Sequence, residues 1–233
     1  MMKVAIQTYF GQEREKIAKE ARKAGFVLDG GKPDFVIIYG GDGTVLSSEA
    51  AFPGVPKLVF RKSIPGTHYP SCRLAELDKV LESLSKGQCS IREYAKALAE
   101  VKGKKLSGLN EVQIHNADPR KAIRFDVSLD GKPLYKNVIG DGIVAATPFG
   151  SHAYYMAVGC KPFETGLRAA FNNTKPRPNP VELDKDDILA IEIKREKALV
   201  LADNQKDFVN LASGDRVEIR QAKDVARFVL FRG

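Results

Sequence analysis

The sequence of 233 residues has no tryptophan, only three cysteines and only three histidines. Cys72, Cys89 and Cys160 are far apart, with no CxxC pair and no histidine at ligand spacing. This pattern argues against a disulfide scaffold and against a structural zinc site. No apolar run reaches the roughly 18 residues of a membrane-spanning helix. The N-terminal residues lack the features of an export signal, so we expect a cytoplasmic protein without a membrane partner.

Aromatic residues are also scarce, at 8% of the chain, and they do not alternate with basic residues. A base-stacking surface is therefore not indicated, and we expect no nucleic-acid partner. The 37 Lys and Arg residues exceed the 29 Asp and Glu residues and give a formal net charge of +8. This excess favours polyanionic partners, a class that includes phosphorylated metabolites. The apolar fraction of 43% is enough for a substantial core.

The first third of the chain alternates strand-like and helix-like segments, which is typical of a parallel sheet flanked by helices. The sequence therefore predicts an α/β N-terminal domain over residues 1–90. The strand-like segments are 4–6, 35–39 and 57–60, and the helix-like segments are 12–24, 45–51 and 74–86.

Beyond residue 90 the apolar residues alternate with period two, as in half-buried antiparallel strands. Asp130-Gly131 lies between two such segments and predicts a hairpin. Three prolines over residues 172–180 predict an irregular loop. We expect a mostly antiparallel β-sandwich domain over residues 91–220, with 221–233 returning to the first domain.

The segment Gly40-Gly41-Asp42-Gly43-Thr44 follows a buried apolar run and precedes a helical one. Glycines let backbone amides approach a ligand closely, and amides at a helix N-terminus favour anions. A carboxylate there repels phosphate unless it binds a metal or accepts a proton from an attacking hydroxyl. The alternative is a plain tight turn, since Asp-Gly is a common turn pair. The context favours a phosphate site.

Two further polar segments follow. In residues 140–154 an apolar strand ends at Thr147-Pro148, and Ser151 is placed to cap a helix that begins near Tyr154. A nucleotide site and a capped helix explain this segment equally well. The pair Asn110-Glu111 begins another strand and offers an amide and a carboxylate. By itself an exposed polar pair explains it better.

Taken in order, these segments resemble the NAD kinase family, which carries a GGDGT loop, an Asn-Glu pair and a DG-x4-TP-x-GS-x-AY segment. The likeness extends from Met2 to about Phe231 and includes the α/β-then-β organisation. The resemblance implies transfer of a phosphoryl group from ATP or polyphosphate to the 2′-hydroxyl of the adenosine ribose of NAD, giving NADP. It also implies Mg²⁺ or another divalent cation with ATP, and a homo-oligomer, either dimer or tetramer.

The resemblance implies roles for individual residues as well. Asp42 would be the catalytic carboxylate, and no protein-held metal site is expected. The phosphates of ATP would bind at Gly40, Gly41, Gly43 and Thr44. NAD would bind at Asn110, Glu111, Asp141, Ser151, His152, Ala153 and Tyr154.

The chain departs from the family pattern at Phe149, His152, Cys160 and the segment Arg61-Lys62-Ser63. These departures leave the catalytic loop intact but alter residues expected near the substrate. Two alternatives therefore stay open. One is a non-catalytic NAD(P)-binding regulatory protein of the same fold, and the other is a related kinase that acts on a lipid or another alcohol.

Overall fold

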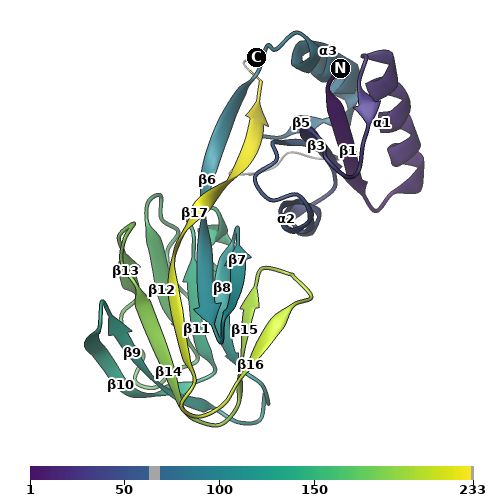
Figure 1. Ribbon diagram of the computed structural model, residues 1–233. Coiled ribbons are helices and arrows are strands. Elements are labelled where there is room, and N and C mark those ends of the chain that lie inside the picture. The colour runs from purple at the N-terminus through teal and green to yellow at the C-terminus, as the bar shows by residue number, and fades with distance from the viewer. Residues whose placement is uncertain (63–68, 232–233) are drawn as a thin grey trace. The chain divides into compact units, whose positions relative to one another are not determined.

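The computed structural model describes residues 1–62 and 69–231, so Ser63 lies outside the described residues. The chain forms two compact units, Met1–Tyr94 with Val225–Gly233 and Ala95–Asp224. Strands β6 (Ser90–Val101) and β17 (Arg216–Leu230) contain the two points where the chain passes between them (Figure 1). The sequence-based boundaries were residues 90 and 220.

The first unit is a parallel sheet flanked by helices, as the alternating segments predict. Its strands are arranged in the order β5-β4-β3-β1-β2, and Phe228 of β17 pairs in parallel with Lys57 of β4. Apolar side chains of two helices, including Ile17 and Leu81, belong to the same buried cluster as those of the sheet. The strands are β1 (Lys3–Thr8), β2 (Val27–Leu28), β3 (Phe35–Tyr39), β4 (Lys57–Arg61) and β5 (Cys72–Arg73). The helices are α1 (Gly11–Lys23), α2 (Asp42–Ala51), η1 (Leu74–Glu76) and α3 (Leu77–Ser85).

Helix α2 begins earlier than the sequence predicts. It starts at Asp42 rather than at residue 45, because Gly41 is extended and its carbonyl accepts hydrogen bonds from the amides of Thr44 and Val45. An acidic residue in the first turn is favourable next to the helix dipole. Asp42, Gly43 and Thr44 are therefore the first helical turn, and only the two preceding glycines form the connection from β3.

The second unit contains two β-sheets that share one hydrophobic core, as predicted for a β-sandwich. One sheet has the antiparallel order β10-β9-β14-β17, and β6 pairs with β17 and β7; the other has the order β13-β12-β11-β8-β15-β16. The first sheet's remaining strands are β7 (Lys104–Gly108), β9 (Ile123–Leu129), β10 (Lys132–Gly140) and β14 (Leu189–Arg195). The second sheet's strands are β8 (Glu111–Asn116), β11 (Gly142–Ala146), β12 (Leu167–Asn172), β13 (Val181–Leu183), β15 (Ala198–Ala202) and β16 (Phe208–Leu211).

Local expectations for this unit are confirmed at two turns and wrong at one. Asp130 and Gly131 both have positive φ, of 50° and 75°, and they connect β9 to β10 as a tight hairpin. Residues 173–180 contain no helix or strand. Ser151 does not cap a helix: it lies in the short 3-10 helix η2 (Gly150–His152), and Ala153 precedes helix α4 (Tyr154–Ala157) without a side-chain cap. Among the described residues, no helix is both long enough and apolar enough to cross a membrane.

A buried ion pair fixes the far end of α2. Lys57 at the start of β4 is inaccessible to solvent and pairs with Glu49 of α2, whose side chain is 3% exposed. The Lys57 ammonium also donates to the carbonyl oxygens of Phe52 and Val55, each at 2.8 Å. Glu49 in turn accepts a hydrogen bond from the amide of Gly54 at 3.2 Å. The pair therefore connects α2, which carries Asp42 at its other end, to strand β4 of the sheet.

We expect Lys57→Met to lower the free energy of unfolding by about 3 to 5 kcal/mol, because it leaves the Glu49 carboxylate buried without its partner. Adding Glu49→Leu removes that charge and recovers most of the loss. Urea unfolding at pH 7 measures both. Lys86→Met, at the exposed Glu82 pair, is the control and changes little. A Lys57→Met protein within about 1 kcal/mol of wild type would contradict this account.

Candidate functional site

The Asp42 carboxylate is held by one oxygen only. Oδ1 accepts a hydrogen bond from Nη2 of Arg61 at 2.9 Å and another from the hydroxyl of Tyr69 at 2.6 Å. Oδ2 accepts no hydrogen bond from a described residue, and the side chain is 64% exposed. The carboxylate is thus oriented but keeps one oxygen open to a ligand.

The two side chains that hold Asp42 are themselves well packed. Arg61 is 16% exposed at the end of β4, and its guanidinium lies 5.4 Å from the centre of the Tyr69 ring. Tyr69 is buried and its ring packs against Phe228. Burial and the hydrogen bond to Asp42 raise the pKa of the Tyr69 hydroxyl, so it stays protonated and donates at physiological pH.

The glycines before Asp42 have different functions. A Cβ on Gly40 would lie 2.3 Å from Oγ1 of Thr44, so only glycine allows Thr44 to fold back over the strand end. A Cβ on Gly41 would meet nothing closer than Nη2 of Arg61 at 3.9 Å. The Arg61 guanidinium therefore lies beside the glycine connection whose amides are predicted to bind phosphate.

In the second unit, Asn110 and Glu111 are held by a residue that the sequence analysis did not identify. The Asp203 carboxylate accepts hydrogen bonds from three consecutive backbone amides: Leu109 at 2.7 Å, Asn110 at 2.8 Å and Glu111 at 3.1 Å. Asp203 follows β15, which pairs with β8. The only sequence signal for Asp203 was its residue type, because aspartate tolerates the positive φ of 46° that it adopts here.

The Thr-Pro-x-Gly segment holds the same turn from its other side. The Thr147 hydroxyl donates to the carbonyl of Leu109 at 2.6 Å, and the Thr147 amide donates to the carbonyl of Asn110 at 2.9 Å. Gly150 packs directly on Asn110, since a Cβ at this glycine would lie 2.1 Å from the Asn110 carbonyl oxygen. The structure therefore brings together two segments that are about 40 residues apart, as the motif order suggested.

Asp141 and Tyr154 also lie in this part of the second unit. Oδ2 of Asp141 accepts from the Asn173 amide group at 2.9 Å, and the Tyr154 hydroxyl accepts from that of Asn172 at 2.9 Å. Burial raises the pKa of Tyr154, and the nearby carboxylates of Asp141 and Glu111 add to this effect. Asn172 at the end of β12 and the following Asn173 thus bind two of the predicted residues, Tyr154 and Asp141. The sequence analysis identified neither asparagine as a site residue.

The predicted residues in segment 151–153 differ in accessibility. Ser151 is completely buried, and its hydroxyl donates to the carbonyl of Pro148 at 2.8 Å. His152 and Ala153 are exposed. Phe149, one of the departures from the family pattern, is buried. His152 and Ala153 are therefore accessible to a ligand, whereas the Ser151 hydroxyl is already engaged by the protein.

Glu111 and Asp203 form a carboxyl pair of unequal acidity. Burial and the neighbouring Asp203 raise the pKa of Glu111 to about 8, and Oε2 of Glu111 is buried without a hydrogen-bond partner among the described residues. Burial raises the pKa of Asp203 to about 6, and the three amide donors oppose that rise. Burial and the neighbouring carboxylate therefore favour the protonated form of Glu111, whereas the three amides favour the ionised form of Asp203. A protonated Glu111 donates a hydrogen bond, whereas the sequence had suggested a carboxylate acceptor.

No group of three or more His, Cys, Asp or Glu side chains with metal-binding geometry occurs in residues 1–62 and 69–231.

Sequence comparison finds similar proteins among the NAD kinases. Residues 109–231 match the family model described as the ATP-NAD kinase C-terminal domain. The chain is 29% identical over 206 residues to an NAD kinase of Thermoplasma acidophilum. The aligned region covers 85% of this chain and 74% of that relative.

Two solved structures have a similar fold. The yeast NADH kinase complexed with NADH gives a TM-score of 0.85 at 17% identity, covering 100% of this chain and 84% of that one. An NAD kinase from Archaeoglobus fulgidus in complex with ATP gives a TM-score of 0.80 at 17% identity, covering 97% and 93%.

Because the pKa of Glu111 is raised, we expect the free energy of unfolding to decrease as the pH rises. Between about pH 4.5 and pH 8 the unfolded chain ionises at this residue while the folded protein keeps the proton, so unfolding becomes easier as pH rises. Glu111→Gln mimics the protonated side chain and removes this slope. Relative to wild type, we expect the free energy of unfolding of the variant to increase by on the order of 3 kcal/mol between pH 5 and pH 8.5.

Urea unfolding at the two pH values measures this difference. Glu164→Gln, at an exposed position, is the matched control and should follow wild type. Parallel pH dependences for wild type and Glu111→Gln would contradict a protonated Glu111.

Proposed function

Because this chain belongs to the NAD kinase family, we propose that it transfers the terminal phosphoryl group of ATP to the 2′-hydroxyl of the adenosine ribose of NAD, with Asp42 as the catalytic carboxylate. One observation carries the assignment of Asp42: its Oδ1 is fixed by two donors, while Oδ2 is open at the N-terminus of a helix. A general base needs this combination of fixed orientation and a free lone pair.

The proposed mechanism assigns separate tasks to α2 and Asp42. The amide of Gly41 and the first amides of α2 bind the phosphates of ATP, since a helix N-terminus favours negative charge. The amide of Gly40, which the sequence had also suggested, already donates to the carbonyl of Phe60 at 3.2 Å. Oδ2 of Asp42 accepts the proton of the 2′-hydroxyl as that oxygen attacks the terminal phosphorus. Phosphoryl transfer depends mostly on positioning and charge neutralisation, so few protein groups are needed.

Arg61 makes an acidic residue tolerable at a phosphate site. Its guanidinium neutralises the Asp42 carboxylate through one N–H group and lies beside Gly41, where the phosphates are expected. An arginine has five donors in a planar arrangement that suits both carboxylate and phosphate. The departure from the family pattern at position 61 therefore adds a cation next to the transferred group.

A divalent cation, Mg²⁺ above all, is part of the proposal. The exposed carboxylate oxygen Oδ2 of Asp42 is the type of ligand that Mg²⁺ takes in addition to substrate phosphates. When bound, the cation would neutralise charge on the phosphate oxygens.

In the second unit, we assign the dinucleotide site to Asn110, Glu111, Asp141, His152, Ala153 and Tyr154, with Ser151 as a buried support. The protonated Glu111 donates a hydrogen bond to the substrate, and Asp141 accepts one. In this proposal His152, which is exposed and stands where the family has Thr, contacts the dinucleotide. The proposal further includes a homo-oligomer, either dimer or tetramer, in the cytoplasm.

Incubation of the purified protein with NAD, ATP and Mg²⁺ tests the activity, with NADP measured as the product. Polyphosphate replaces ATP in a second arm, and NADH and simple alcohols replace NAD in a third. NADP formation supports the proposal. Binding of NAD without turnover would instead support a regulatory protein, and phosphorylation of another alcohol alone would support a related kinase.

Asp42→Asn keeps the shape of the side chain but removes its basicity. We expect kcat to fall by about 10²- to 10⁴-fold, with the dissociation constant of NAD changed by less than about twofold. Steady-state kinetics and calorimetric titration with NAD measure the two effects. Asp78→Asn, on the exposed side of α3, is the control. Retention of more than about half of the wild-type turnover would remove Asp42 from the mechanism.

Arg61→Gln removes the positive charge of the guanidinium and one of the two donors that hold Oδ1 of Asp42. We expect kcat to fall by about 10- to 100-fold while the KM for NAD stays the same, because the orientation of Asp42 matters only in the reaction step. Arg61→Lys keeps the charge and restores part of the loss. Lys62→Gln, at the exposed neighbouring position, should match wild type. A rise in KM for NAD without a fall in kcat would contradict the role given to Arg61.

A further inference from the structure

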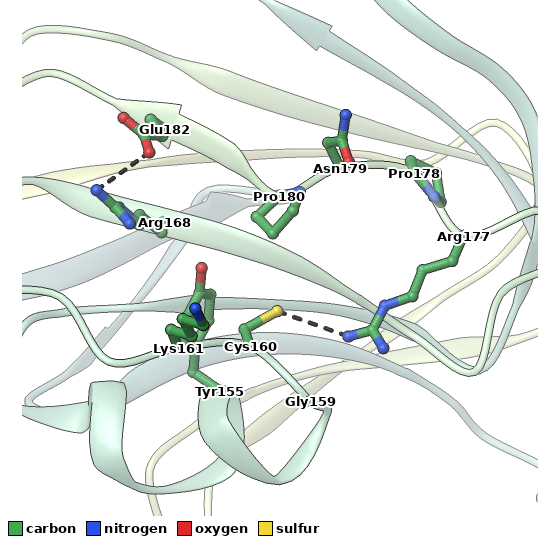
Figure 2. Close-up of a pocket in the computed structure, with 10 residues that line it drawn as sticks. All are labelled: Tyr155, Gly159, Cys160, Lys161, Arg168, Arg177, Pro178, Asn179, Pro180 and Glu182. Carbon is green, nitrogen blue, oxygen red and sulfur yellow. Dashed lines mark hydrogen bonds and ion pairs between the residues drawn. The ribbon is translucent and has the colours of Figure 1, made fainter.

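The second unit has a polar pocket that the proposed reaction does not use. Its volume is about 590 Å³, which is within the range of small-molecule sites. The wall is formed by the end of α4 with the residues after it, by β12 and β13, and by the proline-containing loop (Figure 2). Tyr154 belongs to the dinucleotide site, whereas the next residue, Tyr155, is buried and lines this pocket.

The charge of the pocket is strongly asymmetric. Lys161, Arg168 and Arg177 line it, against a single carboxylate, Glu182. Cationic groups that converge on one concave surface repel each other unless an anion or carboxylate lies among them. The pocket thus has more positive charge than its own acidic residue neutralises.

Arg177 is held over the pocket in a fixed position. One terminal nitrogen, Nη2, donates to the carbonyl of Val158 and to Sγ of Cys160, the latter at 3.5 Å (Figure 2). Gly159 makes room for it: φ is +83° there, and a Cβ would lie 3.1 Å from Nη1 of Arg177. Nη1 and Nε have no hydrogen-bond partner in the part of the chain that the structure describes. The guanidinium is thus oriented before any ligand binds and still has donors to offer.

The ion pair of Arg168 with Glu182 is weak enough for a ligand to replace. Its Nη2 pairs with Glu182 at 3.0 Å, and its guanidinium lies 4.9 Å from the centre of the Phe163 ring. The Glu182 side chain is 72% exposed, so water screens this ion pair and little free energy is lost when it opens. A multivalent anion offers Arg168 a better partner at the same place.

The remaining walls favour a compact, multiply charged group over a simple apolar ligand. Pro178 and Pro180 are rigid, and the polar residues Tyr155 and Asn179 also line the pocket. Burial raises the pKa of the Tyr155 hydroxyl to about 12, so at physiological pH it is a neutral hydrogen-bond donor. Two planar guanidinium groups and an ammonium match the tetrahedral oxygens of phosphate.

We propose that this pocket is a second anion site, in which Arg177, Arg168 and Lys161 bind a phosphate-bearing small molecule. The pocket shares no lining residue with the residues assigned to the reaction, and it does not require the proposed activity. Its occupant covers the Cys160 thiol, which lies in the pocket wall beside Arg177. The cysteine therefore serves as a local reporter of binding.

Alkylation of Cys160 by iodoacetamide tests the proposal, with pyrophosphate as the probe and sodium chloride holding the ionic strength constant. Peptide mass spectrometry follows Cys160 and Cys89 in the same sample, and Cys89, in the first unit, is the internal control. We expect saturating pyrophosphate to slow alkylation of Cys160 by at least about fivefold and to leave Cys89 unchanged. Inorganic phosphate should act in the same way at higher concentration.

Variants distinguish a specific binding site from a non-specific effect of positive charge. Arg177→Gln should raise the pyrophosphate concentration for half protection by about tenfold or more, and Arg177→Lys by less. Arg195→Gln, at an exposed position on β14, keeps the wild-type response. Equal protection in wild type and Arg177→Gln would overturn the proposal, and so would equal slowing by chloride alone or no slowing at all. None of these readouts depends on NADP formation, so failure here leaves the proposed kinase activity unaffected.

Discussion

The hydrogen bonds from three consecutive amides to Asp203 are the interaction on which the site of the second unit depends. A carboxylate taken out of water needs donors, and here the amides of residues 109–111 supply them. That demand fixes the turn before β8, and Thr147 and Gly150 then pack on the same turn. Burial, with the added effect of the neighbouring Asp203 carboxylate, raises the pKa of Glu111, so the residue that shapes this turn also contributes to the protonation of the site.

The first unit uses the opposite arrangement. Asp42 is exposed, and two side chains rather than backbone amides hold one of its oxygens. Because only Oδ1 accepts hydrogen bonds from described residues, Oδ2 stays accessible to a ligand. The buried ion pair of Lys57 with Glu49 fixes the helix behind it. A rigid support with an accessible reacting group is what a general base requires.

The departures from the family pattern differ in where they lie. Arg61 holds the catalytic carboxylate, and Phe149 is buried. His152 is exposed beside the predicted dinucleotide residues. Cys160 lies in the separate basic pocket. Within the second unit, the departures therefore do not share one surface, because Phe149 is buried and Cys160 lines a pocket whose wall does not include His152.

The amino-acid sequence was sufficient to predict the two fold classes, the Asp130-Gly131 hairpin and the change from strand to helix around Gly40 and Gly41. These features follow from periodicity and turn chemistry, which act over a few residues. The sequence did not predict that Arg61 and Tyr69 both donate to one oxygen of Asp42, or that Asp203 binds a turn 94 residues earlier in the chain. The protonation of Glu111 likewise depends on burial and on a carboxylate brought close by strand pairing. No local pattern contains such long-range contacts, because strand order and register alone bring the partners together.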